Sequence, residues 1–272
     1  MHRPRSDTLF AGSIPELYDR LLVPLIFQPY ADDLARRVAA LAPSRVLETA
    51  AGTGVVTRAM ARALSAHVEL IATDLTQPML DRAAAVGTSR PVQWQQADAM
   101  QLPFGDECFD VVVCQSGVMF FPDKVHAFAQ ARRVLRRGGV LLFNVWDRIE
   151  DNELAELVTA TLAEVFPADP PRFMARTPHG WFDQATMTRD LAGAGFNEPP
   201  SIETVTERSR APSALTAAMA YCQGTVLRTE IEARQGATLV QATAICEAAI
   251  AKRFGAGKID AKIQAHVVSV RR

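Results

Sequence analysis

The residues best suited to chemistry follow the apolar run Val46-Leu47, where Glu48 leads into a turn that contains Gly52 and Gly54. Glycines in a strand-to-helix turn let the backbone pass close to a bound ligand and adopt conformations closed to other residues. The helix expected directly afterwards presents unpaired N–H groups at its start. The turn is therefore a candidate ligand site, although the same pattern also suits a tight strand-to-helix connection that binds nothing.

An acid follows the next apolar run in a comparable position. Asp74 ends the run that starts at Val68 and lies about 26 residues after Glu48. A carboxylate at this place in an α/β sheet can accept hydrogen bonds from both hydroxyls of a ribose. Its alternative role is to cap the helix expected from Gln77.

Two further strand ends carry polar groups. Asp98-Ala99 follows the third apolar run and suits recognition of an adenine edge by one carboxylate and one backbone N–H, although loop aspartates also serve turns. Gln115 follows the fourth run and would face the same edge of the sheet, or would satisfy backbone groups there. Because ligands of open α/β sheets bind at the carboxyl ends of the strands, these residues together predict one site.

The elements that would position these residues alternate between strand and helix. Short strands are expected at 45–48, 68–73, 92–95, 109–114 and 140–145, and the segment 109–114 is dense in β-branched residues. Helical spacing predicts helices at 55–64 and 77–86, and a third from 125 that ends at Gly138-Gly139. This alternation predicts an α/β fold, a Rossmann-like, doubly wound, mostly parallel seven-stranded sheet with helices on both faces.

The flanking regions have a different pattern. Residues 12–43 are expected to be helical, and the C-terminal part is expected to hold helices at 154–165 and 184–194, a Pro-rich loop at 167–178, strands at 202–206 and 263–270, and an almost wholly helical stretch at 212–254. We therefore expect a single domain over 1–272. It divides into an N-terminal helical cover (12–43), a cofactor-binding core (44–147) and a C-terminal part (148–272) with a helical insertion at 212–256.

The sequence resembles the class I S-adenosylmethionine-dependent methyltransferases of the ubiquinone/menaquinone-biosynthesis type over about residues 12–147. The likeness rests on the glycine motif from Glu48 to Gly54, on Asp74, on the segment 98–104, on Phe109-Asp110-Val111-Val112, on 133–139 and on Ala194-Gly195-Phe196. One departure is Ala50, where the family usually has glycine, and its methyl group would tighten the approach to the cofactor.

The resemblance implies a role for each matching residue in binding S-adenosyl-L-methionine, or its product S-adenosyl-L-homocysteine. The implied cofactor contacts are Glu48, Ala50, Gly52 and Gly54 at the methionine end and glycine turn, Asp74 at the ribose, Leu75, Met79, Asp98 and Ala99 at the adenine, Gln115 near the sulfonium, and Tyr18 as a cover. Met79 is equally compatible with ordinary helix packing.

The expected activity is methyl transfer to a small, apolar or partly apolar molecule. The catalytic residues are unknown. An acceptor hydroxyl would need a base, for which His126, His179 and Asp123 are candidates outside any recognisable motif. The 212–254 stretch, with an apolar face, is either a lid over the acceptor or plain packing.

Two other classes of function remain as alternatives. A nicotinamide-dependent oxidoreductase shares the glycine turn and the ribose acid, but Thr57 stands where its third glycine would fall. A non-catalytic S-adenosylmethionine-binding module would keep the cofactor residues and lack turnover.

The composition limits the classes of binding partner that we expect. The 272 residues carry a net charge of −1, so no overall basic field favours nucleic acid or an anionic membrane. The four cysteines are scattered without metal-ligand spacing, and no apolar run has the length of a membrane span. We expect a cytoplasmic monomer or homodimer that binds a small-molecule acceptor and no metal.

Overall fold

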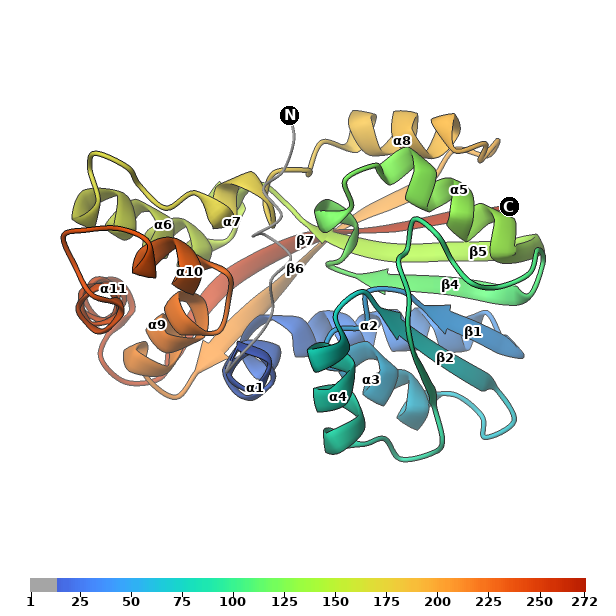
Figure 1. Cartoon of the computed structure of the whole chain (residues 1–272), viewed down its shortest axis with the longest axis horizontal. Helices are drawn as coiled ribbons and strands as arrows, with labels where there is room; N and C mark the ends of the chain where they lie inside the picture. The colour runs from blue at the N-terminus through green and yellow to red at the C-terminus, as the bar shows by residue number, and fades with distance from the viewer. Residues whose placement is uncertain (1–13) are drawn as a thin grey trace. The chain divides into compact units, whose positions relative to one another are not determined.

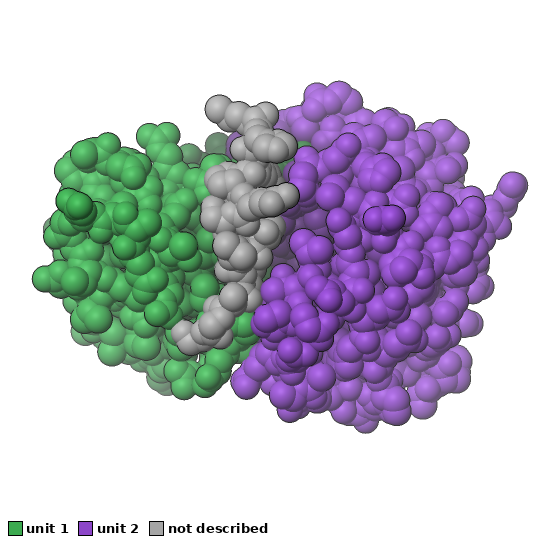
Figure 2. Space-filling view, in the orientation of Figure 1, with its two compact units in different colours: residues 1–29, 146–181, 206–264 green, residues 30–145, 182–205, 265–272 purple. Residues whose placement is uncertain are grey.

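The chain folds as two units whose segments interleave along the sequence (Figure 2). The computed structural model describes residues 14–272. Unit 1 takes in the residues up to 29 together with 146–181 and 206–264, and unit 2 comprises 30–145, 182–205 and 265–272. The expected start of the N-terminal helical cover, residues 12 and 13, lies outside the described residues. The expected single domain, with its three-part division, stays a prediction.

Unit 2 contains a seven-stranded sheet in the order β3-β2-β1-β4-β5-β7-β6, whose last two strands continue into unit 1. The strands are β1 (Arg45–Glu48), β2 (Glu69–Asp74), β3 (Gln93–Gln96), β4 (Phe109–Gln115), β5 (Leu135–Trp146), β6 (Ser201–Ala211) and β7 (Ile259–Arg271). The first five run parallel, with Val46 opposite both Leu70 and Val111. Their carboxyl ends therefore lie along one edge of the sheet.

The other end of the sheet is antiparallel. The backbone N–H of Arg272 donates to Gly139, and that of Asp147 donates to Gln264, so β7 runs against β5. Figure 1 shows α2 (Gln28–Ala40) and α3 (Val55–Ala63) on one face of the sheet and α5 (Lys124–Val134) and α8 (Gln184–Gly193) on the other. The prediction of a mostly parallel, doubly wound seven-stranded sheet is confirmed.

Most predicted elements of unit 2 lie within a residue or two of their observed bounds, including α4 (Gln77–Val86). The helix that was expected to end at Gly138-Gly139 is the exception, because α5 ends at Val134. Leu135 pairs with Phe109 in the parallel ladder, so residues 135–139 begin β5 instead of extending the helix. The glycines lie in the strand, where Gly138 has φ +77°.

Unit 1 is built mainly from helices: α1 (Ile14–Leu17), the π-helical η2 (Tyr18–Phe27), α6 (Glu153–Val165), α7 (Phe173–Arg176), α9 (Ala214–Gln223), α10 (Leu227–Glu232) and α11 (Leu239–Phe254). The stretch 212–254 is almost wholly helical, as expected, and forms three helices. Two expectations need correction here, because the Pro-rich loop contains α7 and because β6 and β7 are longer than the strands expected at 202–206 and 263–270. Within residues 14–272, no helix has the length and apolarity to cross a membrane.

Candidate functional site

The turn after β1 holds three residues in the left-handed backbone region: Ala50 (φ +51°), Gly52 (φ +56°) and Gly54 (φ +82°). Backbone hydrogen bonds fix it between its neighbours, because Ala51 N–H donates to Thr73 O (2.9 Å) and Gly54 N–H donates to Ala51 O (2.9 Å). Left-handed backbone costs glycine little, which explains two of these residue types. The turn then leads directly into α3.

Ala50 accommodates its methyl group against a glycine on the neighbouring strand end. A Cβ atom built on Gly117 would lie only 2.5 Å from Ala50 Cβ and 2.8 Å from Cys114 Sγ. Gly117 therefore leaves room for the side chain that departs from the family pattern. This pairing could not be predicted from the sequence, since the two residues are 67 positions apart.

Glu48 ends β1 as a buried carboxyl group, 2% exposed. Its Oε2 accepts a hydrogen bond from the hydroxyl of Thr57, which is itself fully buried. Burial raises the pKa of Glu48 to about 8, and the charge of Asp74 adds to this against the opposing effects of Thr57 and Arg58. Glu48 is thus held in place and kept protonated near neutral pH until a cation or donor approaches.

Asp74 connects the ends of β1 and β2. Its Oδ2 accepts from Gly52 N–H and its Oδ1 from Thr76 N–H, both at 2.8 Å. Burial raises the pKa of Asp74, against the lowering effect of these bonds. The carboxylate does not cap α4 through its first-turn amides, so its main structural role is to hold the glycine turn. Each oxygen retains capacity for a second donor.

At the ends of β3 and β4 the polar groups are also tied to the protein. Asp98 Oδ1 accepts from Met100 N–H at 2.8 Å, which is a local turn, and leaves the second carboxylate oxygen for other partners. Gln115 Oε1 accepts from the amide of Asn144 at 3.3 Å, and Asn144 Oδ1 accepts from Ser116 N–H at 2.9 Å. Asn144 was missed from the sequence, although an amide inside the apolar run 140–145 was the available signal.

The remaining predicted residues fall in different surroundings. Met79 is buried in α4 and Leu75 is 52% exposed beside Asp74. Tyr18 lies in unit 1, where its ring packs 5.1 Å from that of Phe27, so its covering role stays a prediction. Among the candidate bases, Asp123 caps α5 by accepting from His126 N–H at 2.9 Å.

The glycine turn itself leaves some space and one unpaired group. The direction in which a side chain would leave Gly52 is open, with no atom within 4 Å of an added Cβ. The hydroxyl oxygen of Thr53, in the same turn, is fully buried and has no hydrogen-bond partner among the described residues. Carboxyl groups stand at or just after the ends of the three neighbouring strands β1, β2 and β3. Across residues 14–272 there is no cluster of side chains suited to a metal ion.

The two glycines of the turn are expected to respond differently to alanine. At Gly54, a methyl group would lie 2.8 Å from Trp94 Cη2 with φ at +82°, so Gly54→Ala should lower the free energy of unfolding by about 2–4 kcal/mol. Gly52→Ala meets no atom and should cost only about 1 kcal/mol of backbone strain. Urea unfolding of both variants checks this, and equal losses would contradict the steric argument.

Comparison with known proteins agrees with this geometry. Residues 47–143 match a family model described as a methyltransferase domain. The ubiquinone/menaquinone biosynthesis C-methyltransferase UbiE of Azotobacter vinelandii is 32% identical over 166 residues, which cover 56% of this chain and 66% of that protein. The alignment thus spans slightly less than two thirds of this relative.

Solved structures show the same fold at low sequence identity. An arsenic(III) S-adenosylmethionine methyltransferase from Chlamydomonas reinhardtii superposes with a TM-score of 0.50 and 17% identity, covering 84% of this chain and 63% of that one. The 4+2 cyclase SpnF superposes with a TM-score of 0.58 and 18% identity, covering 100% of this chain and 98% of that one. The fold therefore accompanies more than one kind of reaction.

Proposed function

We propose that residues 47–143, which match a family model described as a methyltransferase domain, form a class I S-adenosylmethionine-dependent methyltransferase domain, and that the chain transfers the methyl group of S-adenosylmethionine to a small molecule. The observation that supports the proposal is that Glu48, Asp74, Asp98 and Gln115 lie at or just after the carboxyl ends of four neighbouring parallel strands of unit 2, with Asp74 bonded to the glycine turn. The matched region contains all four residues.

The cofactor supplies an already activated methyl group on a sulfonium, so the protein's contribution is positioning and exclusion of water. We assign Asp74 to the two ribose hydroxyls and Asp98 with Ala99 N–H to the adenine. Glu48 would meet the methionine end, and Gln115, held by Asn144, would form the floor near the sulfonium. Leu75 and Met79 would supply apolar contact on either side of the adenine.

We propose a small, apolar or partly apolar acceptor, rather than nucleic acid. The near-zero net charge supports this, as does the similarity to an enzyme named for ubiquinone and menaquinone biosynthesis. A lid formed by 212–256 remains part of the proposal. Deleting these residues is a poor test, because Tyr221, Cys246 and Ile250 are buried in unit 1 and deletion would expose its core.

The alternatives make different predictions for ligand binding. In an oxidoreductase the position of Thr57 would be a third glycine, whereas here the Thr57 hydroxyl is fully buried and bonded to Glu48. A non-catalytic module would bind the cofactor without turnover. Calorimetric titration with S-adenosylhomocysteine and, separately, with NAD(H) distinguishes the first case. Radiolabelled methyl transfer to a panel of small phenols, amines and quinols distinguishes the second, and binding of NAD(H) alone would refute the proposed function.

Glu48→Gln is expected to change the pH dependence of stability. Since burial raises the pKa of Glu48 to about 8 from 4.5, the folded chain holds a proton that the unfolded chain releases within this interval. The stabilisation is complete below pH 4.5 and is lost as the pH rises towards 8, by about 1.4 kcal/mol per pH unit for one proton. Glutamine cannot ionise, so the variant should lose this slope and be the more stable protein at pH 8.

Urea unfolding at pH 5.5, 6.5 and 7.5 measures the effect. The pKa of Asp74 is also raised by burial, so any contribution of Asp74 to the slope has the same sign and is present in both proteins. Parallel pH profiles for the wild type and Glu48→Gln would show that Glu48 ionises normally in the folded protein.

A further inference from the structure

A pocket of unit 2 lies at the end of the sheet opposite the glycine turn. Its volume is about 340 Å³, and it is lined where α2 ends, where β4 and β5 begin and where β7 ends. Because β7 runs against β5, its last residues lie beside the first residues of β5, and Gly138 N–H donates to Arg272 O at 3.0 Å (Figure 1). Every lining residue belongs to unit 2. The pocket is therefore separate from the strand ends that carry Glu48 and Asp74.

The charged lining of the pocket is mainly basic. It comprises three arginines and one acid, which are Arg136, Arg137, Arg271 and Asp110. Arg136 Nη1 lies 2.7 Å from Asp110 Oδ1, and the other oxygen of this carboxylate accepts from two backbone N–H groups at the start of β1. Asp110 thus neutralises Arg136, and both of its oxygens have partners. The other two arginines are left without a carboxylate inside the pocket.

Arg137 and Arg271 carry charges that the protein does not balance closely. The side chain of Arg137 is 90% exposed, and its ion-pair partner Glu107 lies 3.8 Å away and is held at 2.9 Å by Arg272. Arg271 donates to Gly138 O at 3.3 Å, and among residues 14–272 no carboxylate lies within 4 Å of its guanidinium group. The pocket therefore offers two guanidinium groups to an incoming anion.

The rest of the lining is apolar or glycine. Leu41 and Pro43 come from the segment after α2, and Val111 and Val140 come from the strands, where they are 1% and 6% exposed. Gly138 leaves further room, because no atom lies within 4 Å of a Cβ added there. A volume of about 340 Å³ is at the small end of the range for ligand pockets, which suits a single small molecule better than a polymer.

We propose that this pocket binds a small molecule that carries a phosphate monoester on an apolar body. Near pH 7 a phosphate monoester has a charge of about −1.5 to −2, which matches the two unbalanced guanidinium groups of Arg137 and Arg271 better than a carboxylate does. Each guanidinium fork can donate two parallel hydrogen bonds to phosphate oxygens. The apolar body lies against Leu41, Val111 and Val140. Binding at this pocket does not depend on the proposed function.

Calorimetric titration of the full chain with phenyl phosphate, at pH 7.5 and low ionic strength, tests the pocket. Arg271→Gln should weaken binding about tenfold, because it removes one charge-assisted bidentate contact. Arg189→Gln is the matched control, since it makes the same charge change at an exposed side chain of α8 that does not line the pocket. It should leave the affinity for phenyl phosphate unchanged.

A second variant and three related probes sharpen the test. Arg137→Gln alters a side chain that is 90% exposed, so it should leave urea unfolding unchanged and still weaken phenyl phosphate binding about tenfold. Phenyl sulfate carries a single charge, inorganic phosphate lacks the ring, and phenol lacks the anion. Each should bind about tenfold more weakly than phenyl phosphate, or not at all.

Absent binding of phenyl phosphate would overturn the proposal, as would equal affinities in Arg271→Gln and Arg189→Gln. Displacement of phenyl phosphate by S-adenosylhomocysteine would also overturn it, because the ligand would then lie at the other end of the sheet. Equal affinity for inorganic phosphate would refute the apolar body, and equal affinity for phenyl sulfate would refute the need for two charges. A wild type that binds phenyl phosphate and not S-adenosylhomocysteine would support the pocket and count against the proposed function alone.

Discussion

Replacing Asp74 with alanine is expected to weaken S-adenosylhomocysteine binding about a hundredfold. In the proposed site this carboxylate accepts hydrogen bonds from two ribose hydroxyls, and each bond to a charged group contributes about 1.5–3 kcal/mol. A loss of about 2.8 kcal/mol corresponds to the hundredfold change. Isothermal titration calorimetry at pH 7.5 measures it directly, and an unchanged dissociation constant would remove Asp74 from the site.

The control must separate ligand contact from damage to the fold, because Asp74 also accepts from Gly52 N–H and Thr76 N–H. Asp110, at the start of β4, offers a close match. Its Oδ2 accepts from the backbone N–H groups of Ser44 and Arg45, both at 2.8 Å, at the opposite end of the parallel strands. Asp110→Ala should therefore lower stability without changing the affinity for S-adenosylhomocysteine.

The sheet of unit 2 was predictable because its determinants are local. The run Phe109 to Cys114 is rich in β-branched residues, and the helices between strands show apolar residues at helical spacing. Both kinds of element are therefore determined by residues that are neighbours in the sequence. The end of α5 was not predictable in this way. Leu135 leaves the helix to pair with Phe109, 26 positions earlier, and glycines that resembled a helix stop became part of a strand.

The candidate site likewise contains residues that could be predicted from the sequence and residues that could not. Its strand-end residues were found from the sequence, because a parallel sheet brings successive carboxyl ends to one edge whatever the details of packing. The partners of those residues were not found. Thr57 was noted only as a missing glycine, yet it donates to Glu48, and Asn144, inside the strand expected at 140–145, holds Gln115.

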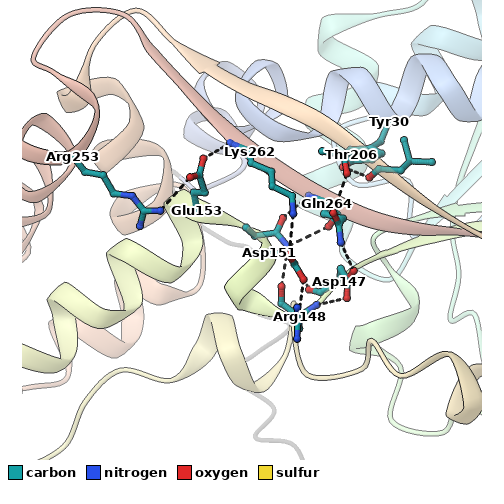
Figure 3. Close-up of polar contacts among 11 residues, drawn as sticks. Tyr30, Asp147, Arg148, Asp151, Glu153, Thr206, Arg253, Lys262 and Gln264 are labelled. Atoms are coloured by element: carbon teal, nitrogen blue, oxygen red, sulfur yellow. Dashed lines mark hydrogen bonds and ion pairs between the residues drawn. The ribbon is translucent and has the colours of Figure 1, made fainter.

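Unit 1 shows most clearly what cannot be predicted from the sequence, since its polar contacts join residues that are far apart in the chain (Figure 3). His179 meets the carbonyl of Asp147 across 32 positions, and Asn152 meets Gln264 across 112. No periodicity encodes such pairs. They depend on where helices and strands finally pack, and the residues around His179 in the sequence contain no motif that would indicate its bond to Asp147 O.

Asn152→Ala is expected to lower the free energy of unfolding by about 2–4 kcal/mol, the largest stability effect we predict for a residue of unit 1. Asn152 is 1% exposed and its carboxamide pairs with the backbone of β7 as a neighbouring strand would. Its Oδ1 accepts from Gln264 N–H at 3.0 Å, and its Nδ2 donates to Gln264 O at 3.2 Å and to Arg148 O at 3.1 Å. Alanine leaves these backbone groups without their partner.

Urea unfolding of Asn152→Ala beside Asn152→Asp and Arg148→Ala tests whether the loss comes from the amide pairing itself. Aspartate keeps an acceptor for Gln264 N–H but places a carboxylate against Gln264 O, so it should restore little of the stability. Arg148→Ala removes an exposed side chain four positions away and should change the unfolding midpoint very little, because solvent screens its ion pair with Asp151. If Asn152→Ala unfolded at the wild-type midpoint, the pairing with β7 would contribute nothing to unit 1.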